Sequence, residues 1–427
     1  MKALAVLMVW AAAGMAEVRM GHAGFDATPS EWVAWSPRAE IAPRTFQDAM
    51  HYRTRPPSLA ISGNSNAAVF GGWECTVPGI QAGGWYRFTA WYRAEAVGYE
   101  PLQVVSRLDW AREGGKRAGQ PDYVWSATRQ GEWTRVTLDA PAPPEAAAVK
   151  VQLYLQNAPH ATVWWDDVSL EKIAAPGPRE VRVAAVNARP GKRGTTADSV
   201  THFLKVIEQA VPEKTDVIVL PEGITVVDTG KKYAEVAEPV PGPTTTILGE
   251  VARRRKSYIA AGIYEREGQA VYNTAVLIDR EGRVAGKYRK VYIPREELED
   301  GITPGADYPV FLTDFGKVGM MICWDLQYAD PARALAMRGA EIILLPIWGG
   351  NETLGKARAI ENQVFVASSG YDYPTYVMDP DGQIMALAKD RGQAAVATID
   401  LNRRYTDKWL GNMRARFMKE LRLDLRP

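Results

Sequence analysis

The spacing of hydrophobic and polar residues changes along the chain and divides the sequence into two parts. In the first part, short segments such as 85–92, 149–155 and 163–170 have alternating or aromatic-rich patterns. Glycine and proline separate such segments, for example at 83–84 and 141–144. Period-two patterns with frequent turns predict an all-β sandwich rather than alternating strands and helices.

The second part alternates strands with helices. Residues 196–211 place apolar side chains at helical spacing on one face, and Pro212 ends this helix. Residues 216–220 form a short apolar run, as expected for a strand that is covered on both faces. Residues 174–178 contain two prolines and a glycine, which indicate a linker. We therefore predict a β-sandwich domain over 17–173, a linker over 174–179 and a layered α/β domain over 180–427.

The first 16 residues have the pattern of a secretory signal peptide. Lys2 precedes an almost unbroken apolar run over 3–13, and small residues follow up to Ala16. This run is shorter than the about 20 apolar residues that a membrane-spanning helix needs. We therefore expect cleavage near Ala13 or Ala16 and a secreted or periplasmic protein, with an uncleaved anchor as the alternative.

Charge and cysteine content exclude several classes of protein. The chain has 51 Lys and Arg residues against 50 Asp and Glu residues, a net charge of +1, so no strong field is available to bind nucleic acid or an anionic membrane. The two cysteines, Cys75 and Cys323, lie in different predicted domains. A framework of disulfides is therefore not expected, and Cys323 is expected to be a free thiol.

Histidine is scarce in the second part, and this limits its chemistry. His202 is the only one of the four histidines in this part, at the start of the first predicted helix. A zinc site built on several histidines is not available there, and a Cys–His or Ser–His–Asp catalyst would have to use His202. No glycine-rich phosphate loop of the Walker or Rossmann pattern follows a strand. A hydrolase in this part would need a carboxylate or a lysine as its base.

Three chemical groups in the second part meet that need. Glu222 comes just after a buried strand, where α/β sheets place their ligand sites. Lys290 closes a Lys-Tyr-Arg-Lys motif, and Cys323 ends an apolar strand and opens a Cys-Trp-Asp motif. Each signal alone is weak, because a carboxylate after a strand is usually a solvated cap and such a cysteine is usually a small core residue.

Together, the three motifs resemble those of the nitrilase superfamily of carbon–nitrogen hydrolases. The resemblance runs from about Val181 to beyond Asp400, and it includes the stretches 331–341 and 358–362. It implies an αββα four-layer sandwich in which the three residues form a catalytic triad. No metal and no organic cofactor is implied.

The chemistry of amide hydrolysis fits these residue types. Glu222 can take the thiol proton of Cys323, return it to the leaving amine and then activate the water that opens a thioester. Lys290 can donate to the oxyanion, with the backbone N–H of Trp324 as a second donor. The resembling superfamily often adds a second glutamate that binds the lysine or the substrate.

Three glutamates that follow the lysine in the sequence, Glu296, Glu297 and Glu299, are candidates for this second glutamate. We expect Glu297, with Glu296 as the alternative. Superfamily members that cleave N-carbamoyl amino acids carry an arginine pair where this chain has Leu326 and Gln327. Tyr328 and Trp348 are expected as walls of the pocket. The expected substrate is therefore a neutral or amine-bearing linear amide or N-carbamoyl amine, and the motifs resemble the N-carbamoylputrescine amidase branch most.

Other functions stay open. Residues 163–170 resemble the last strand of jelly-roll domains of the galactose-binding and carbohydrate-binding type, so the aromatic residues before them either fill a core or bind a glycan or polymer. An N-acyltransferase of the same superfamily would normally carry several transmembrane helices. A catalytically silent glycan-binding protein is the non-enzymatic alternative. Superfamily members often dimerise, which makes a homodimer a further expectation.

Overall fold

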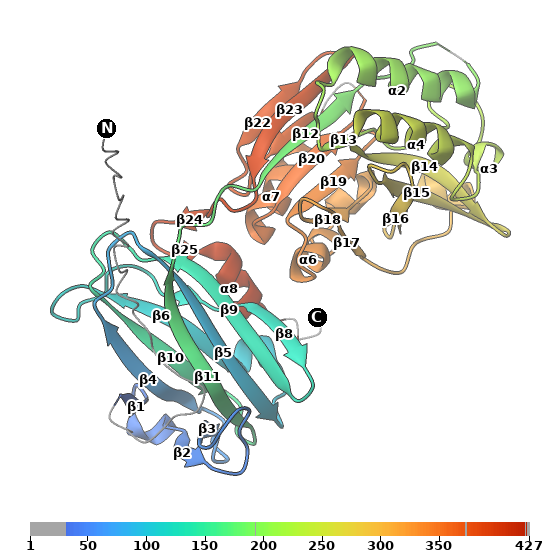
Figure 1. The fold of residues 1–427 in the computed structure, drawn as a ribbon. Coiled ribbons are helices and arrows are strands. Elements are labelled where there is room, and N and C mark those ends of the chain that lie inside the picture. Colours follow the sequence, from blue (N-terminus) through green and yellow to red (C-terminus); the bar gives the residue numbers. More distant parts are fainter. Residues whose placement is uncertain (1–30, 193, 372–373, 423, 425–427) are drawn as a thin grey trace, which may run out of the picture. The chain divides into compact units, whose positions relative to one another are not determined.

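The computed structural model describes residues 31–192, 194–371, 374–422 and 424, and they form two compact units (Figure 1). The first unit combines the described residues up to Pro176 with those from Thr406 onward, and the second runs from Gly177 to Tyr405. The boundary between the units after Pro176 falls within the predicted linker. The second unit ends at Tyr405, whereas the α/β domain was predicted to extend to residue 427. The predicted signal peptide lies outside the described residues.

The first unit is built from two antiparallel sheets. The five-stranded sheet has the order β1 (Trp32–Trp35), β4 (Phe70–Pro78), β10 (Ala148–Gln156), β6 (Val104–Ala111) and β7 (Asp122–Tyr123). The six-stranded sheet has the order β2 (Arg44–Asp48), β3 (Ser58–Ser62), β11 (Thr162–Ile173), β5 (Trp85–Glu95), β9 (Trp133–Pro141) and β8 (Ser126–Gln130). All neighbouring strands in both sheets run antiparallel.

One hydrophobic core joins these two sheets. Val151 and Leu153 of β10 meet Phe88 of β5 in it, and Trp110 and Trp165 are fully buried. Alternate residues of each strand point to opposite faces, so the period of two in the sequence becomes an apolar inner face here. These aromatic side chains therefore fill the core.

The last helix, α8 (Met413–Glu420), explains why the end of the chain belongs to the first unit. The Lys419 side chain is only 9% exposed, and its Nζ donates to the backbone carbonyl of Val104 at 2.7 Å. Ala415 on the same helix is buried as well. Burial lowers the pKa of Lys419 to about 8. The helix is thus held by a buried polar contact to β6.

The second unit has two six-stranded sheets with parallel centres and antiparallel edges. The first has the order β16 (Val284–Arg289), β15 (Ala270–Ile278), β14 (Tyr258–Glu267), β13 (Val217–Val219), β12 (Glu180–Asn187) and β23 (Gln393–Asp400). The second has the order β17 (Val310–Leu312), β18 (Lys317–Met320), β19 (Ile342–Pro346), β20 (Phe365–Ser369), β21 (Thr375–Met378) and β22 (Ile384–Ala388).

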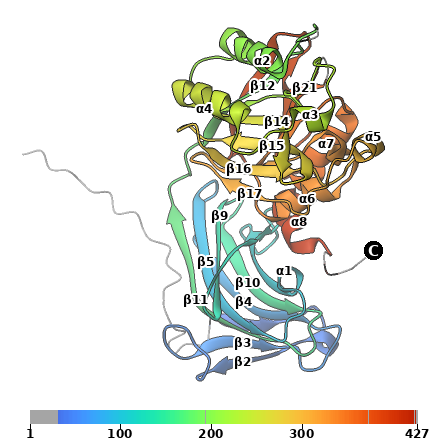
Figure 2. The ribbon, with the colours of Figure 1, turned by 90° about the vertical axis from the view of Figure 1, so that its right-hand side faces the viewer.

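Helices cover one face of each of these sheets, and the other faces pack on each other. Val183 and Val219 share a core with Met320 and Leu344 of the other sheet. Helices α2 (Thr196–Ala210) and α4 (Pro243–Arg255) pack on the first sheet, and α6 (Asp330–Met337) and α7 (Glu352–Asn362) pack on the second (Figures 1 and 2). Among the described residues, no helix has both the length and the apolar character needed to cross a membrane.

Candidate active site

Each of the three expected catalytic residues follows the end of a strand in the second unit. Glu222 comes after β13 and Lys290 directly after β16, both in the first sheet. Cys323 comes after β18 of the second sheet. Because the two sheets pack on each other, these strand ends bring together residues that are far apart in the sequence.

Lys290 lies at the centre of the site and is 1% exposed. Its Nζ is 2.9 Å from Oε1 of Glu222 and 2.9 Å from Oε1 of Glu297. Burial alone would lower the pKa of this amine, but the charges of Glu222, Cys323 and Glu297 outweigh burial and raise the pKa above its usual value. The lysine therefore stays an ammonium at neutral pH and acts as a hydrogen-bond donor rather than as a base.

Cys323 opens the short 3-10 helix η2 (Cys323–Gln327) in the left-handed region, with φ of 41°. A non-glycine residue there costs about 1–3 kcal/mol, which is typical of functional turns. The residue is partly exposed, and its Sγ lies 3.7 Å from the carbonyl oxygen of Gly349. Burial of the thiol and the neighbouring carboxylate of Glu222 raise its pKa to about 12. The thiol is therefore protonated at neutral pH and needs a base to become a nucleophile.

The structure distinguishes the two candidates for the second glutamate. Glu297, on α5 (Arg295–Glu299), is 6% exposed and binds Lys290, whereas Glu296 is exposed and contacts Arg295. Burial raises the pKa of Glu297. Its second oxygen, Oε2, is buried and has no hydrogen-bond partner among the described residues. This oxygen is available to accept a hydrogen bond from a substrate.

Two further residues of the site were not expected from the sequence. The amide nitrogen of Asn273, in β15, donates to Oε1 of Glu222 at 2.7 Å and to Oε1 of Glu297 at 3.0 Å. The hydroxyl of the buried Tyr371 donates to the backbone carbonyl of Glu222. A polar amide inside a largely apolar strand was the available signal for Asn273, because buried polar groups need partners.

Several aromatic side chains near Cys323 are exposed. Trp324 and Tyr328 belong to η2 and its end, and both remain exposed. Tyr328 stacks on Tyr292 with ring centres 3.9 Å apart. Trp348, also exposed, precedes the residue whose carbonyl faces the Cys323 thiol, and a Cβ added at Gly223 would lie 3.5 Å from its ring. Trp348 therefore lies close to the segment that carries Glu222.

The turn that carries the thiol is also held at its far end. Leu326, at one of the two positions compared with the arginine pair of carbamoylases, is buried in the hydrophobic core. The Arg358 guanidinium donates to the carbonyl of Leu326 at 3.1 and 3.3 Å and to that of Gln327 at 3.2 Å. The Gln327 residue itself is exposed.

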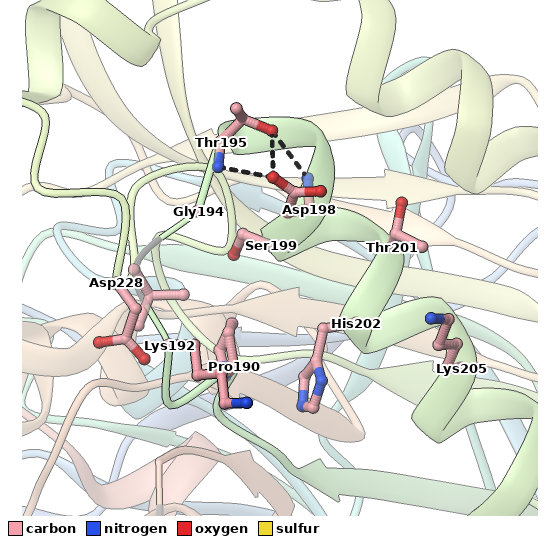
Figure 3. Close-up of a pocket in the computed structure, with 11 residues that line it drawn as sticks. Pro190, Lys192, Gly194, Thr195, Asp198, Ser199, Thr201, His202, Lys205 and Asp228 are labelled. Carbon is pink, nitrogen blue, oxygen red and sulfur yellow. Dashed lines mark hydrogen bonds between the residues drawn. The ribbon is translucent and has the colours of Figure 1, made fainter.

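His202 stands apart from the triad. It lines a surface pocket of about 340 Å³ at the beginning of α2, and none of the three triad residues lines this pocket (Figure 3). Asp198 in the same pocket caps the helix by accepting from the N–H of Thr195 at 2.8 Å. Burial lowers the pKa of His202. Across the described residues, no group of three or more His, Cys, Asp or Glu side chains is arranged to hold a metal ion.

Comparisons with known proteins point to the same part of the chain. A family model described as "Carbon-nitrogen hydrolase" matches residues 182–409. The chain is 29% identical over 236 residues to the omega-amidase of Homo sapiens (48% of this chain, 84% of that protein). It is 33% identical over 231 residues to a nitrilase of Pyrococcus abyssi (48% of this chain, 85% of that protein). A solved nitrilase-superfamily structure from Saccharomyces cerevisiae is 25% identical, with a TM-score of 0.47, and the match covers 52% of this chain and 90% of that one.

Proposed function

Because the chain belongs to the carbon–nitrogen hydrolase family, we propose that it cleaves the carbon–nitrogen bond of a linear amide or N-carbamoyl amine and releases ammonia. The observation that carries this proposal is the position of Lys290, a buried ammonium 2.9 Å from the carboxylates of both Glu222 and Glu297 and electrostatically coupled to Cys323. Buried charges are costly unless they are paired, and clusters of them with shifted pKa values are typical of functional sites.

The first half of the reaction forms a thioester. Glu222 removes the proton from the Cys323 thiol, and the sulfur then attacks the carbonyl carbon of the substrate. Negative charge develops on the carbonyl oxygen, where the Lys290 ammonium and the backbone N–H of Trp324 donate hydrogen bonds. Glu222 gives its proton to the leaving nitrogen, the carbon–nitrogen bond breaks, and ammonia leaves.

The second half returns the enzyme to its starting state. Glu222, now a carboxylate again, removes a proton from water, and the resulting hydroxide attacks the thioester carbon. The tetrahedral intermediate collapses with loss of the Cys323 sulfur, which takes the proton back from Glu222. The unpartnered oxygen of Glu297 is suited to accept an N–H of the substrate amide and so to orient the carbonyl.

We also propose that the helix–sheet–sheet–helix packing of this unit is the four-layer αββα sandwich.

The residues around the thiol favour a substrate that carries no carboxylate group. At the two positions after the cysteine motif, Leu326 is buried and Gln327 is neutral. The exposed rings of Tyr328 and Trp348 offer apolar and π surfaces instead, which suit a neutral chain or a cationic amine. We therefore propose carbamoylamines and ω-amides as the substrates to test first.

Ammonia release tests the proposal. Purified protein is assayed with carbamoylamines, ω-amides and nitriles, and Cys323→Ala serves as the blank. We expect ammonia from at least one class with wild type and none with the variant. Adding an amine acceptor separates hydrolysis from acyl transfer, because a transferase would form a new amide instead of the free acid. Equal turnover by Cys323→Ala would contradict the mechanism.

A further inference from the structure

One buried carboxylate beside the triad has no role in the chemistry above. Asp325, in η2, is 0% exposed. Its Oδ2 accepts from the backbone N–H of Ile322 at 3.0 Å and from the hydroxyl of Tyr288 at 2.7 Å. Its Oδ1 accepts from the backbone N–H of Tyr292 at 2.9 Å. Three donors therefore converge on this one carboxylate.

These donors come from the two segments that carry the reacting groups. Ile322 directly precedes Cys323, whereas Tyr288 and Tyr292 lie two residues before and two residues after Lys290. Asp325 therefore connects the thiol-bearing turn of the second sheet to the lysine-bearing end of β16 in the first sheet. Arg358, by contrast, binds carbonyls within the turn and its end.

We propose that Asp325 is a positioning residue that fixes the sulfur of Cys323 relative to Nζ of Lys290. The role rests on the proposed hydrolysis, since the lysine must reach the oxyanion that forms when the sulfur attacks. Asp325 acts through the two segments it joins. A displacement of about 1 Å in such a geometry can lower a rate by about 100-fold.

The three contacts require a carboxylate and not an amide. Burial raises the pKa of Asp325 to about 6, against the hydrogen bonds from Tyr292, Ile322 and Tyr288, which lower it, so the group is ionised at neutral pH. An asparagine has one acceptor oxygen and one NH2 group. In either orientation, its NH2 group faces a backbone N–H, of Tyr292 or of Ile322, and neither of these can turn away.

The test uses variants in a Cys75→Ala background, so that Cys323 is the only thiol of the chain. Asp325→Asn removes the carboxylate, and Tyr288→Phe removes one donor while both backbone donors stay. Asp314→Asn is the matched control, because it makes the same chemical change at an exposed position of the same unit. The measurements are kcat and KM for the substrate found in the screen, thermal unfolding, and the pH dependence of Cys323 alkylation by iodoacetamide.

We expect Asp325→Asn to lower kcat about 100-fold with KM within about twofold, Tyr288→Phe to lower kcat about tenfold, and Asp314→Asn to match wild type. Alkylation of Asp325→Asn should shift to higher pH, because the ammonium no longer stands correctly beside the sulfur. If Asp325→Asn only removed a negative charge and left the sulfur and the ammonium in place, the alkylation profile would shift to lower pH instead.

Two results would overturn the proposal. One is an alkylation profile that is unchanged or moves to lower pH in Asp325→Asn. The other is a loss of kcat in Asp325→Asn and Tyr288→Phe that only follows a loss of thermal stability. Alkylation needs no substrate, so it tests the role of Asp325 even if the screen finds no amide turnover. An absence of turnover would count against the proposed function alone.

Discussion

The two cysteines of this chain sit in different units and show what makes a thiol useful. Cys75, in β4, is 3% exposed within the sandwich core, and burial raises its pKa to about 11. Burial also raises the pKa of Cys323, to about 12. The two thiols are thus protonated to a similar degree. The two thiols differ in their charged neighbours. Glu222 interacts with the thiol of Cys323, and the Lys290 ammonium lies close enough to favour a thiolate.

Substitution of the two cysteines is expected to show the largest difference in activity. We expect Cys323→Ala to lower kcat by at least about 10⁴-fold, because the nucleophile is lost while the fold stays. Cys75→Ala should leave kcat within about twofold and lower thermal stability slightly, because a small core side chain is trimmed. Steady-state ammonia release and thermal unfolding measure both. Comparable losses of activity in the two variants would refute the assignment of the nucleophile.

Removing the base should have the next largest effect. Glu222→Gln keeps the size of the side chain but cannot take the thiol proton, so we expect kcat to fall about 10³-fold. The residual rate should increase with pH up to the range where the thiol ionises, because hydroxide then replaces the base. A pH–rate profile measures this. A rate that is independent of pH in the variant would show that another group deprotonates Cys323.

The two neighbouring glutamates provide a smaller and sharper contrast. We expect Glu297→Gln to lower kcat about 10- to 100-fold, because it weakens the ion pair with Lys290 and changes a buried oxygen that has no hydrogen-bond partner among the described residues. Glu296→Gln is the matched control on the same helix and should stay within about twofold. Kinetics under identical conditions decide between them, and equal effects would contradict the role of Glu297.

The smallest effect on activity is expected in the first unit. Because the pKa of Lys419 is lowered to about 8 by burial, the unfolded chain binds this proton between pH 8 and the usual range of lysine while the folded unit does not. Stability should therefore rise with pH across this window, by an amount on the order of 3 kcal/mol at most. Lys419→Met should lose this dependence and keep wild-type kcat.

Thermal unfolding of wild type and Lys419→Met between pH 7.5 and 9.5, followed by tryptophan fluorescence, measures this dependence. Identical pH dependence in the two proteins would show that the pKa of Lys419 does not differ between the folded and the unfolded unit.

Much of the second unit followed from local patterns in the sequence. The family expectation, carried by the motifs at Glu222, Lys290 and Cys323, is confirmed by the match over 182–409. They meet where strands of the two mixed sheets end, and a sequence can indicate such strand ends. The β-rich character of the first unit also followed from its period of two, whereas its assignment as a jelly roll stays a prediction.

Other features depend on contacts that local patterns do not encode. Glu296 and Glu297 differ by about 100° around α5, so a choice between them needs the orientation of the helix. Asn273 and Asp325 act through partners from distant segments. The docking of α8 on the first unit rests on the buried contact of Lys419 with Val104, and nothing in the local sequence names that partner.

That docking also has a consequence for how the protein is made. The first unit takes strands from before residue 176 and a helix from after residue 406, with the whole second unit between them. During synthesis, the segment with α8 leaves the ribosome only after the entire second unit has emerged, and domains generally fold as they become available. The strands of the β-sandwich are thus available before the second unit, but α8 can pack on them only after that unit has been made.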